Sequence, residues 1–185
     1  MLVLASASPR RREILGRFIR DFEVVPSGAT EECFLGESEG YAVEVARKKA
    51  REVYTRVRGT IIGADTVVSI NGHILGKPKD REHAFRMLRV LSGRVHEVTT
   101  GYCIIHEGEE NCGAVVTEVK FRELGDDIIQ DYIKTGEPMD KAGAYGIQGR
   151  AGLFVEWIRG DYYNVVGFPL EIVWKLRELG FRVMG

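Results

Sequence analysis

Several things that this sequence lacks limit what the protein can be. No apolar run approaches the roughly 18 residues that a membrane-spanning helix needs, so we expect no membrane association. The formal net charge of −1 gives no general basic field for nucleic acid, so an anion would bind at a local cation cluster. The three cysteines have no CxxC spacing and are odd in number, which favours a reducing compartment over a secreted disulfide framework.

The chain begins with a few apolar residues and then turns basic, which reverses the order found in a secretory signal peptide. We therefore expect a cytoplasmic protein. Of its 185 residues, 44% are hydrophobic and 29% are charged, a globular composition that argues against disorder. This length suits a single domain over residues 1–185, with room for two lobes around a cleft.

The hydrophobic pattern predicts an α/β fold with a mixed twisted sheet and flanking helices. Strands are expected at 1–5, 22–25, 60–70, 73–75, 96–105, 114–121 and 153–158. Helices are expected from Pro9 to about residue 20, at 41–57, after the cap Asp80, at 126–134 and at 169–179. Asn71-Gly72 signals a two-residue hairpin, and polar turns or loops are expected at 26–40, 108–113 and 135–152.

The first helix carries cations at the end where they are unfavourable. Ser8 suits the N-cap and Pro9 the first helical position, which places Arg10, Arg11 and Arg12 in the first turn. Each cation there costs up to about 1 kcal/mol, because a helix N-terminus already has partial positive charge. A bound phosphate would reverse the sign of this effect. The alternatives are therefore an anion site and a solvated basic face.

Asp65 interrupts the mostly apolar segment 60–70. A buried carboxylate is costly unless it is paired, hydrogen-bonded or bound to a metal. Asp65 therefore suits a metal ligand or a general base. The alternative is a structural aspartate that accepts hydrogen bonds from nearby backbone N–H groups.

Gly76-Lys77-Pro78 follows the predicted hairpin. Together with Gly72 it has some likeness to a P-loop, but one residue is missing between the glycines and Pro78 replaces the hydroxyl residue that would hold magnesium. We therefore reject a P-loop. Lys77 is then either a phosphate contact or a surface lysine.

The segment Asp140–Gly149 is rich in glycine, which lets a ligand approach the backbone. Lys141 and Gln148 supply a charge and an amide that can read the edge of a base, and the alternative is a mobile loop. Loops of the length of 135–152 are often functional. Lys48 and Lys49 by themselves indicate a solvated helix face.

The rest of the sequence gives little support for a histidine metal site or a serine nucleophile. The four histidines show no metal-ligand spacing. Ser6 and Ser8 have no adjacent histidine, so a serine nucleophile is poorly supported. Glu31 and Glu32 lie in a loop and by themselves indicate nothing.

Taken together, these segments resemble the Maf family of nucleoside triphosphate pyrophosphatases. The elements occur in family order along nearly the whole chain, and the ordered set is far more specific than any one motif. They are Leu4-Ala-Ser-Ala-Ser-Pro-Arg-Arg11, Ala46-Arg-Lys-Lys-Ala50, Gly63-Ala-Asp-Thr66, Gly76-Lys-Pro78, Leu91-Ser-Gly93 with His96 and Thr99, Asp140 to Gly149, and Val165-Val-Gly-Phe-Pro169.

The resemblance implies an elongated α/β fold with a deep cleft between two lobes, and a homodimer. It implies hydrolysis of a nucleoside triphosphate between the α- and β-phosphates, with a divalent metal, Mg²⁺ or Mn²⁺. Ile147-Gln148-Gly149 looks like the branch that acts on dTTP and UTP, normal or modified, rather than the branch that acts on 7-methyl-GTP.

The resemblance also assigns roles to residues. Asp65 matches the proton acceptor, and Glu32, Lys49 and Lys77 match positions that handle metal and phosphate. The expected metal ligands are Glu32 and Asp65, with Glu31 as the alternative to Glu32. Substrate binding is expected from Ser8, Arg10, Arg11, Thr66, Lys141 and Gln148, of which Arg10, Thr66 and Gln148 match positions of substrate choice.

Two other classes of function compete with hydrolysis. Maf-like proteins are linked by name to the inhibition of septum formation, so the cleft could instead sense a nucleotide and regulate cell division. A nucleic-acid-binding module that uses Arg10 to Arg12 is disfavoured, because the net charge is near neutral and no wider basic stripe accompanies them.

Overall fold

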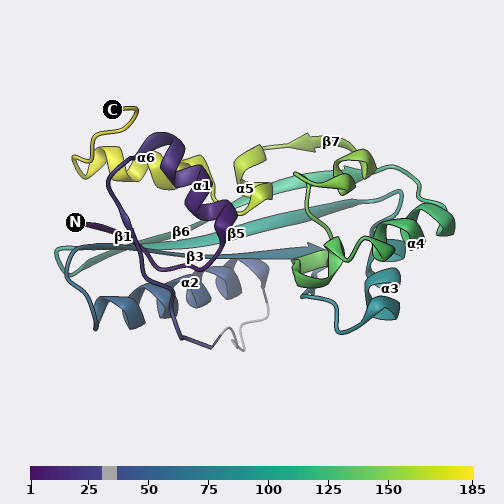
Figure 1. Ribbon diagram of the computed structural model, residues 1–185, viewed down its shortest axis with the longest axis horizontal. Coiled ribbons are helices and arrows are strands. Elements are labelled where there is room, and N and C mark those ends of the chain that lie inside the picture. Colours follow the sequence, from purple (N-terminus) through teal and green to yellow (C-terminus); the bar gives the residue numbers. More distant parts are fainter. Residues whose placement is uncertain (31–36) are drawn as a thin grey trace.

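The computed structural model describes residues 1–30 and 37–185, and its centre is a mixed β-sheet (Figure 1). Within the described residues, seven strands lie in the order β2-β1-β3-β5-β6-β7, with β4 paired to β3. β1 is parallel to β2 and β3, and the other pairs are antiparallel. The strands are β1 (Leu2–Leu4), β2 (Glu23–Val24), β3 (Thr60–Ile70), β4 (His73–Leu75), β5 (Val95–His106), β6 (Glu109–Phe121) and β7 (Val155–Arg159).

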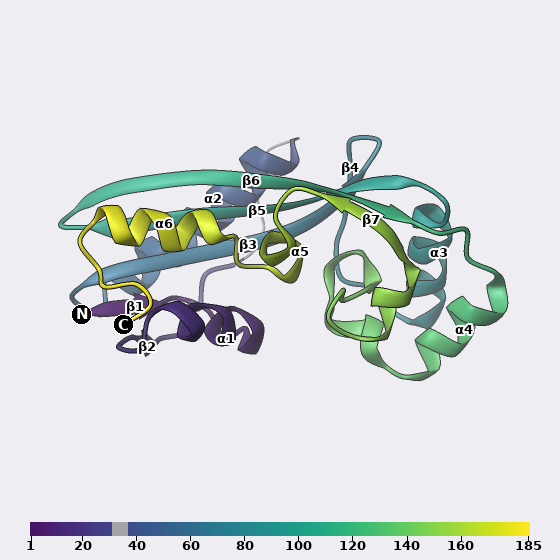
Figure 2. The same cartoon turned by 90° about the horizontal axis from the view of Figure 1, so that it is seen from above.

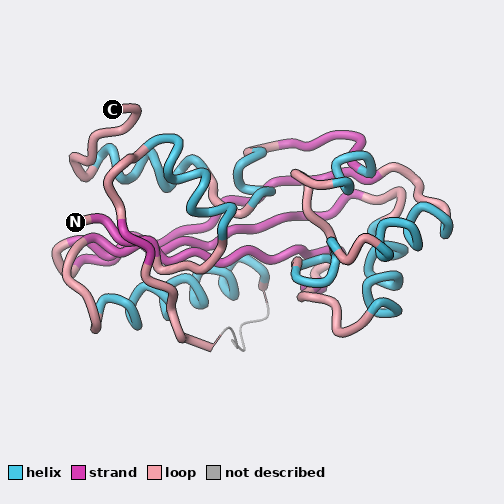
Figure 3. The backbone as a smooth tube through the Cα atoms, viewed as in Figure 1, coloured by secondary structure: helices cyan, strands magenta, loops and turns pink. Residues whose placement is uncertain are grey.

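Helices cover both faces of this sheet. Figures 1 and 3 show α1 and α6 on one face and α2 on the other, with α3 and α4 toward the far end of the long strands; Figure 2 shows the elongated outline from above. The predicted mixed sheet with flanking helices is confirmed, whereas the two lobes around a cleft stay a prediction. The helices are α1 (Pro9–Phe18), α2 (Ser38–Tyr54), α3 (Arg81–Leu91), α4 (Asp126–Lys134), α5 (Tyr162–Val166), α6 (Leu170–Glu178) and the short 3₁₀ helices η1 (Glu137–Asp140), η2 (Ala142–Ala144) and η3 (Arg150–Phe154).

Strand alternation distributes the hydrophobic core over both faces. Leu2 and Leu4 of β1 belong to the cluster that includes α1 and α6, whereas Val3 belongs to the cluster under α2. A third cluster joins the distal half of β3 to α3 and α4. No helix among the described residues is long and apolar enough to cross a membrane.

Two glycines let α2 lie directly on the sheet. A Cβ atom at Gly63 would lie 2.1 Å from the carbonyl oxygen of Ala46, and one at Gly101 would lie 2.1 Å from the carbonyl carbon of Ala42. Both positions therefore require the absence of a side chain for this close approach. The consequence is that side chains of α2 reach the strand positions beside these glycines, including Asp65, which pairs with Gly101 in the register.

The edge of β3 is interrupted between two pairings. β1 pairs with residues 60–62 and β4 pairs with residues 68–70. Residues 63–67 therefore face no strand on this edge within the described chain. Successive side chains of a strand point to opposite faces of the sheet. Asp65 and Thr66 therefore lie on opposite faces, both beside this unpaired edge of β3.

Some predicted boundaries are wrong. The helix expected at 41–57 is α2, which begins and ends earlier, because the chain after Tyr54 changes to a turn in which Arg56 N–H bonds the Val53 carbonyl at 2.9 Å. The 135–152 segment contains η1, η2 and part of η3 rather than only irregular loop. The short helix α5 was not predicted, since five residues give too little periodicity to read.

The prediction of a polar turn at 108–113 is also wrong, because β6 already begins at Glu109. The chain reverses at Glu107 and Gly108, whose φ angles are +51° and +88°, as a two-residue hairpin turn requires. The polar residues that follow are therefore part of β6. This register places Cys112 opposite Cys103, and the two form a disulfide, contrary to the expectation of reduced cysteines.

Candidate active site

A cavity of about 800 Å³ opens beside the interrupted edge of β3. It draws its walls from the start of α1, the end of β4, the segment 140–149 and the end of α5. Glu32 and its alternative Glu31 lie outside the described residues. The other predicted site residues all line this one cavity, and they are Ser8, Arg10, Arg11, Lys49, Asp65, Thr66, Lys77, Lys141 and Gln148.

Asp65 and Lys49 form an ion pair in the cavity wall. Lys49 Nζ lies 2.8 Å from Asp65 Oδ1, and both residues are 8% exposed. The reading of Lys49 as part of a solvated helix face is therefore wrong. A buried carboxylate next to a buried ammonium has its charge compensated, and removing either partner would leave an uncompensated charge.

The start of α1 has the predicted cap. Ser8 is the N-cap, its hydroxyl accepts the Arg11 N–H at 3.4 Å, and Pro9 is the first helical residue. The three arginines of the first turn have different environments. Arg10 and Arg11 line the cavity, while Arg12 is exposed and lies outside it. The solvated-face alternative therefore describes Arg12 alone.

The guanidinium of Arg11 donates hydrogen bonds to β3, to the end of α5 and to Ser6 in the loop before α1. Nε donates to the Gly167 carbonyl at 2.9 Å, one terminal nitrogen donates to the Ala64 carbonyl at 2.8 Å, and the other donates to Thr66 Oγ1 at 3.1 Å. The nitrogen that reaches Ala64 also donates to Ser6 Oγ at 3.2 Å. Arg11 thus ties the start of α1 to the interrupted edge of β3 and to the end of α5.

Arg10 and Lys77 are cations on other parts of the wall. The pKa of the Asp140 carboxyl is lowered, chiefly by the hydrogen bond from Lys141 and to a smaller degree by the charge of Arg10. Arg10 and Asp140, which both line the cavity, therefore attract one another electrostatically. Lys77 is exposed, and the preceding Gly76 carbonyl accepts the N–H of Gly143 at 3.1 Å, which joins the end of β4 to η2.

Lys141 is held by its own segment. Its Nζ donates to the Glu137 carbonyl and to Asp140 Oδ1, both at 2.7 Å. Gln148 is exposed on the same wall, beside Ile147 and Gly149. The segment therefore presents an ordered ammonium and an accessible amide to the cavity.

Several residues that line the cavity were not predicted from the sequence. Glu137 lines the cavity, but a single glutamate in a polar segment gives no signal of function. Val68, Val98 and Tyr145 add an apolar wall. Val68 and Val98 lie in predicted strands and gave no signal of function, whereas Tyr145 lies within the Asp140–Gly149 segment. Val165 to Gly167 also line the cavity; they lie within a family motif and could have been found from it.

His96 packs against Tyr145 of the apolar wall. Its Nε2 lies 2.7 Å from the Tyr145 hydroxyl, and the residue is 1% exposed. Phe121 packs edge-on against both rings, with centroids 4.9 Å and 4.8 Å away. Burial lowers the pKa of His96 from 6.5 to about 4, because the charged imidazolium would lose its hydration.

This burial makes stability depend on pH. The unfolded chain binds a proton at His96 below pH 6.5 and the folded protein only near pH 4, so stability is full above pH 6.5 and falls as the pH drops toward 4. We expect a loss of up to roughly 3 kcal/mol in the free energy of unfolding. Denaturant titrations from pH 7 to pH 4 measure it. His96→Gln should remove most of this slope, and His73→Gln at an exposed position should not; equal slopes in both variants would contradict the assignment.

The charge of the cavity differs from that of the chain. Its described lining includes five cationic side chains, Arg10, Arg11, Lys49, Lys77 and Lys141, and three carboxylates, Asp65, Glu137 and Asp140. The lining is therefore net positive, although the whole chain carries −1. Together with the N-terminus of α1, this is a site for a polyanion with several phosphate groups.

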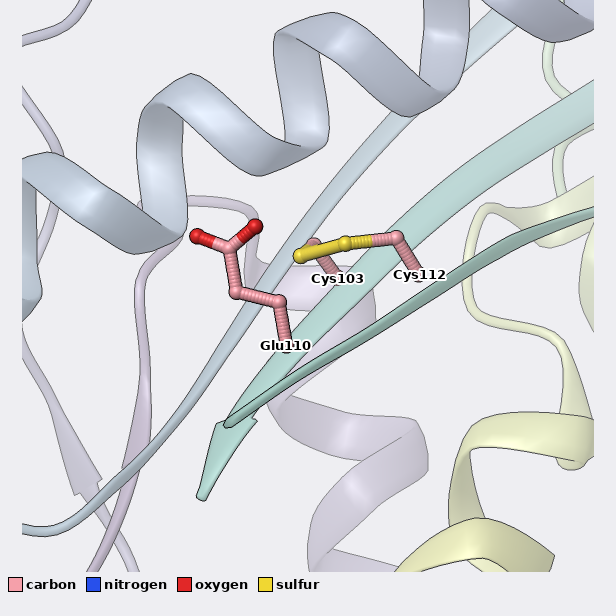
Figure 4. A group of neighbouring side chains, drawn as sticks. All are labelled: Cys103, Glu110 and Cys112. Carbon is pink, nitrogen blue, oxygen red and sulfur yellow. A yellow bond between two sulfur atoms is a disulfide. The ribbon is translucent and has the colours of Figure 1, made fainter. Parts of the chain in front are cut away.

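The one described group of three clustered metal-ligand side chains lies elsewhere. Cys103, Glu110 and Cys112 place their ligand atoms within 4.8 Å of one another (Figure 4). Both sulfur atoms belong to the disulfide, and Arg51 binds the Glu110 carboxylate at 2.6 Å. This group does not line the cavity, so it is separate from the metal site predicted at Asp65.

The fold and the cavity define a class: an α/β protein with a net-positive cavity of about 800 Å³ whose wall contains a buried carboxylate. The chain belongs to the Maf family, since the family model described as Maf-like protein matches residues 1–178. It is 79% identical to the dTTP/UTP pyrophosphatase of Thermococcus onnurineus (strain NA1), covering 100% of both chains. It is 55% identical to that of Pyrococcus horikoshii over 98% of each chain, and 47% identical to that of Clostridium tetani over 96% of this chain and 97% of the relative. The family predicted from the sequence is confirmed.

Proposed function

We propose that this protein hydrolyses dTTP and UTP to the nucleoside monophosphate and pyrophosphate. Relatives that match over the full chain are named dTTP/UTP pyrophosphatase. The observation that carries the proposal is the buried pair of Asp65 and Lys49 in the wall of a net-positive cavity. A carboxylate beside a polyphosphate site suits activation of water, and the surrounding cations suit the charge of the triphosphate.

In this mechanism Asp65 orients the attacking water and accepts its proton. Its position on β3, a central strand, and its contact with Lys49 hold the carboxylate in one place. A fixed base within reach of the water lowers the entropic part of the barrier. Burial of Asp65 and Lys49 strengthens the electrostatic contact between them, because little water screens it.

The cations stabilise charge on the leaving pyrophosphate. Arg10 and Lys77 both line the cavity, and the N-terminus of α1 adds amide dipoles. Lys49 contributes from the Asp65 side. Fixed positive groups of this kind favour the transition state because charge shifts to the bridging and leaving oxygens as the bond breaks.

Arg11 serves this site as a positioning residue rather than as a direct substrate contact. Its hydrogen bonds fix Thr66 and the Ala64 carbonyl beside Asp65. Thr66 also bonds Thr100 through the two hydroxyl oxygens at 2.9 Å, so its side chain is held from two sides. Thr66 is thereby a rigid contact for the substrate.

A divalent metal fits the donors present. Mg²⁺ prefers oxygen ligands and is usually held by one or two carboxylates together with substrate phosphates. Asp65 offers one carboxylate in the cavity, and Glu32 is the predicted second ligand. Mg²⁺ or Mn²⁺ bound there would neutralise part of the triphosphate charge.

Gln148 is proposed to read the base. Gln148→Ala should lower the preference for dTTP and UTP over GTP by about tenfold, because one missing hydrogen bond to a base edge is worth roughly 1.4 kcal/mol. The kcat for dTTP should change less, since Asp65 and the cations are intact. Comparison of kcat/KM across the nucleotides measures this. An unchanged substrate profile would remove Gln148 from this role.

The proposed function is tested by turnover of the purified protein. Pyrophosphate release should be fastest with dTTP and UTP among the common nucleoside triphosphates, and should require Mg²⁺ or Mn²⁺. Tight binding of these nucleotides without turnover would favour the regulatory role in cell division instead. The homodimer, the cytoplasmic location and the single domain over 1–185 stay predictions, and light scattering of the purified protein tests the first.

A further inference from the structure

We propose that Glu137 and Tyr132 are positioning residues that fix the Ile147-Gln148-Gly149 segment and thereby set the choice among nucleotides. This inference rests on the proposed function, because it takes Gln148 as the reader of the base. Tyr132 lies on α4 and Glu137 begins η1. Both precede the Asp140–Gly149 motif in the sequence, and neither belongs to the motifs that carried the family resemblance.

The two side chains hold both ends of the segment that contains Gln148. Glu137 Oε1 accepts the hydroxyl of Tyr132 at 3.0 Å, and Oε2 accepts the N–H of Arg150 at 3.3 Å. The Tyr132 hydroxyl in turn accepts the N–H of Gly146 at 3.4 Å. Backbone donors on either side of residues 147–149 therefore end on one connected pair of side chains.

The contact of Glu137 with this segment requires a glycine at position 149. A Cβ atom at Gly149 would lie 2.0 Å from Glu137 Oε1, so the carboxylate rests directly against the backbone. A side chain at position 149 would displace the carboxylate from the N–H of Arg150. Glycine at position 149 therefore permits the close approach of the Glu137 carboxylate.

The anchor of this network is rigid. Tyr132 is 4% exposed and belongs to the cluster that joins β3, α3 and α4, and its ring lies 5.1 Å from that of Phe154. Burial, and then the Glu137 carboxylate, raise the pKa of the Tyr132 hydroxyl, which therefore keeps its proton and donates it. Glu137 is fixed at its backbone, where its N–H donates to Thr135 Oγ1 at 3.1 Å.

Glu137 also organises the second polar residue of this wall. Its carbonyl accepts Lys141 Nζ at 2.7 Å, so Lys141 and Gln148 are positioned by the same residue. A base edge is discriminated only when donors and acceptors are held in place before the base arrives. Loosening this network should weaken discrimination while it leaves Asp65 and the chemical step intact.

Two variants test the inference without disturbing the shape of the core. Glu137→Gln keeps the size of the side chain but loses one of the two carboxylate acceptors. Tyr132→Phe keeps the ring packing and removes the hydroxyl, so it provides the test even if the first variant folds poorly. Glu156→Gln, at an exposed position of β7, is the matched control.

The measurement is kcat and KM for dTTP, UTP and GTP. We expect both test variants to raise KM for dTTP about tenfold and to lower the preference over GTP by a similar factor, with kcat within about threefold of the unmodified protein. The double variant should add little to either single change, because the two residues act as one unit. Amide hydrogen exchange at Gly146 and Arg150 should become faster, and Glu156→Gln should change nothing.

The outcomes separate this inference from the proposed function. If the unmodified protein fails to turn over dTTP and UTP, the proposed function is wrong. If it turns them over but both variants keep its KM, substrate preference and exchange rates, the positioning role of Glu137 and Tyr132 is wrong. An equal loss of kcat for every nucleotide would also overturn it, because it would indicate a general structural role.

Discussion

Asp65→Asn should lower kcat for dTTP by about 10²–10⁴-fold while the protein stays folded. Asparagine has nearly the same shape and keeps an oxygen that can accept a hydrogen bond from Lys49, but it neither accepts the proton of the attacking water nor carries negative charge. The change therefore removes the chemistry while it retains much of the local packing. Steady-state turnover of dTTP with Mg²⁺ present measures the effect.

Loss of stability must be separated from loss of chemistry in this experiment. Breaking a buried ion pair on one side can cost about 3–5 kcal/mol, so thermal unfolding of the variant should be measured and turnover compared well below its midpoint. Asp131→Asn is the matched control, since Asp131 is an exposed residue of α4 that pairs only at the surface with Lys134. Turnover by Asp65→Asn near the unmodified rate would remove Asp65 from its assigned role.

Arg11→Lys should lower kcat/KM for dTTP by about 10²-fold, nearly as much as Arg11→Met. A lysine keeps the charge but places all its donors on one atom, and it cannot reach the carbonyl groups of Ala64 and Gly167 together with Thr66. A shift of about 1 Å in the site is enough for a loss of this size.

The comparison of the two Arg11 variants distinguishes positioning from direct contact. If Arg11 acted mainly through its charge on the substrate, Arg11→Lys would keep most of the activity and Arg11→Met would lose it. If Arg11 acts through the hydrogen bonds of its guanidinium, both variants should lose kcat/KM to a similar degree, and both should have a lower thermal midpoint. Arg12→Met, on the exposed side of the same helix turn, should change neither quantity.

Much of this site was predictable because each signal was local. Ser8 and Pro9 mark a helix start by their own chemistry, and the arginines that follow are anomalous without reference to any distant residue. Asp65 stands out in the same way, as a carboxylate among apolar neighbours. These signals and their order led to the family and to a cavity that contains all the described predicted residues.

The features that the sequence did not predict depend on contacts between distant segments. Lys49 is buried because Gly63 and Gly101 let α2 lie against the sheet, and neither glycine reveals this in one dimension. Arg11 looks the same as Arg10 and Arg12 until Ala64 and Gly167 are placed beside it. The disulfide was missed because it depends on the register of the β5–β6 hairpin.

The central claim is that this cavity directs hydrolysis to the bond between the α- and β-phosphates. Phosphorus NMR of the products from dTTP and Mg²⁺ tests it most directly, because it identifies the bond that breaks. We expect the unmodified protein to form dTMP and pyrophosphate in equal amounts, and Asp65→Asn to lose both products. Formation of dTDP and orthophosphate, or binding of dTTP with no product at all, would contradict it.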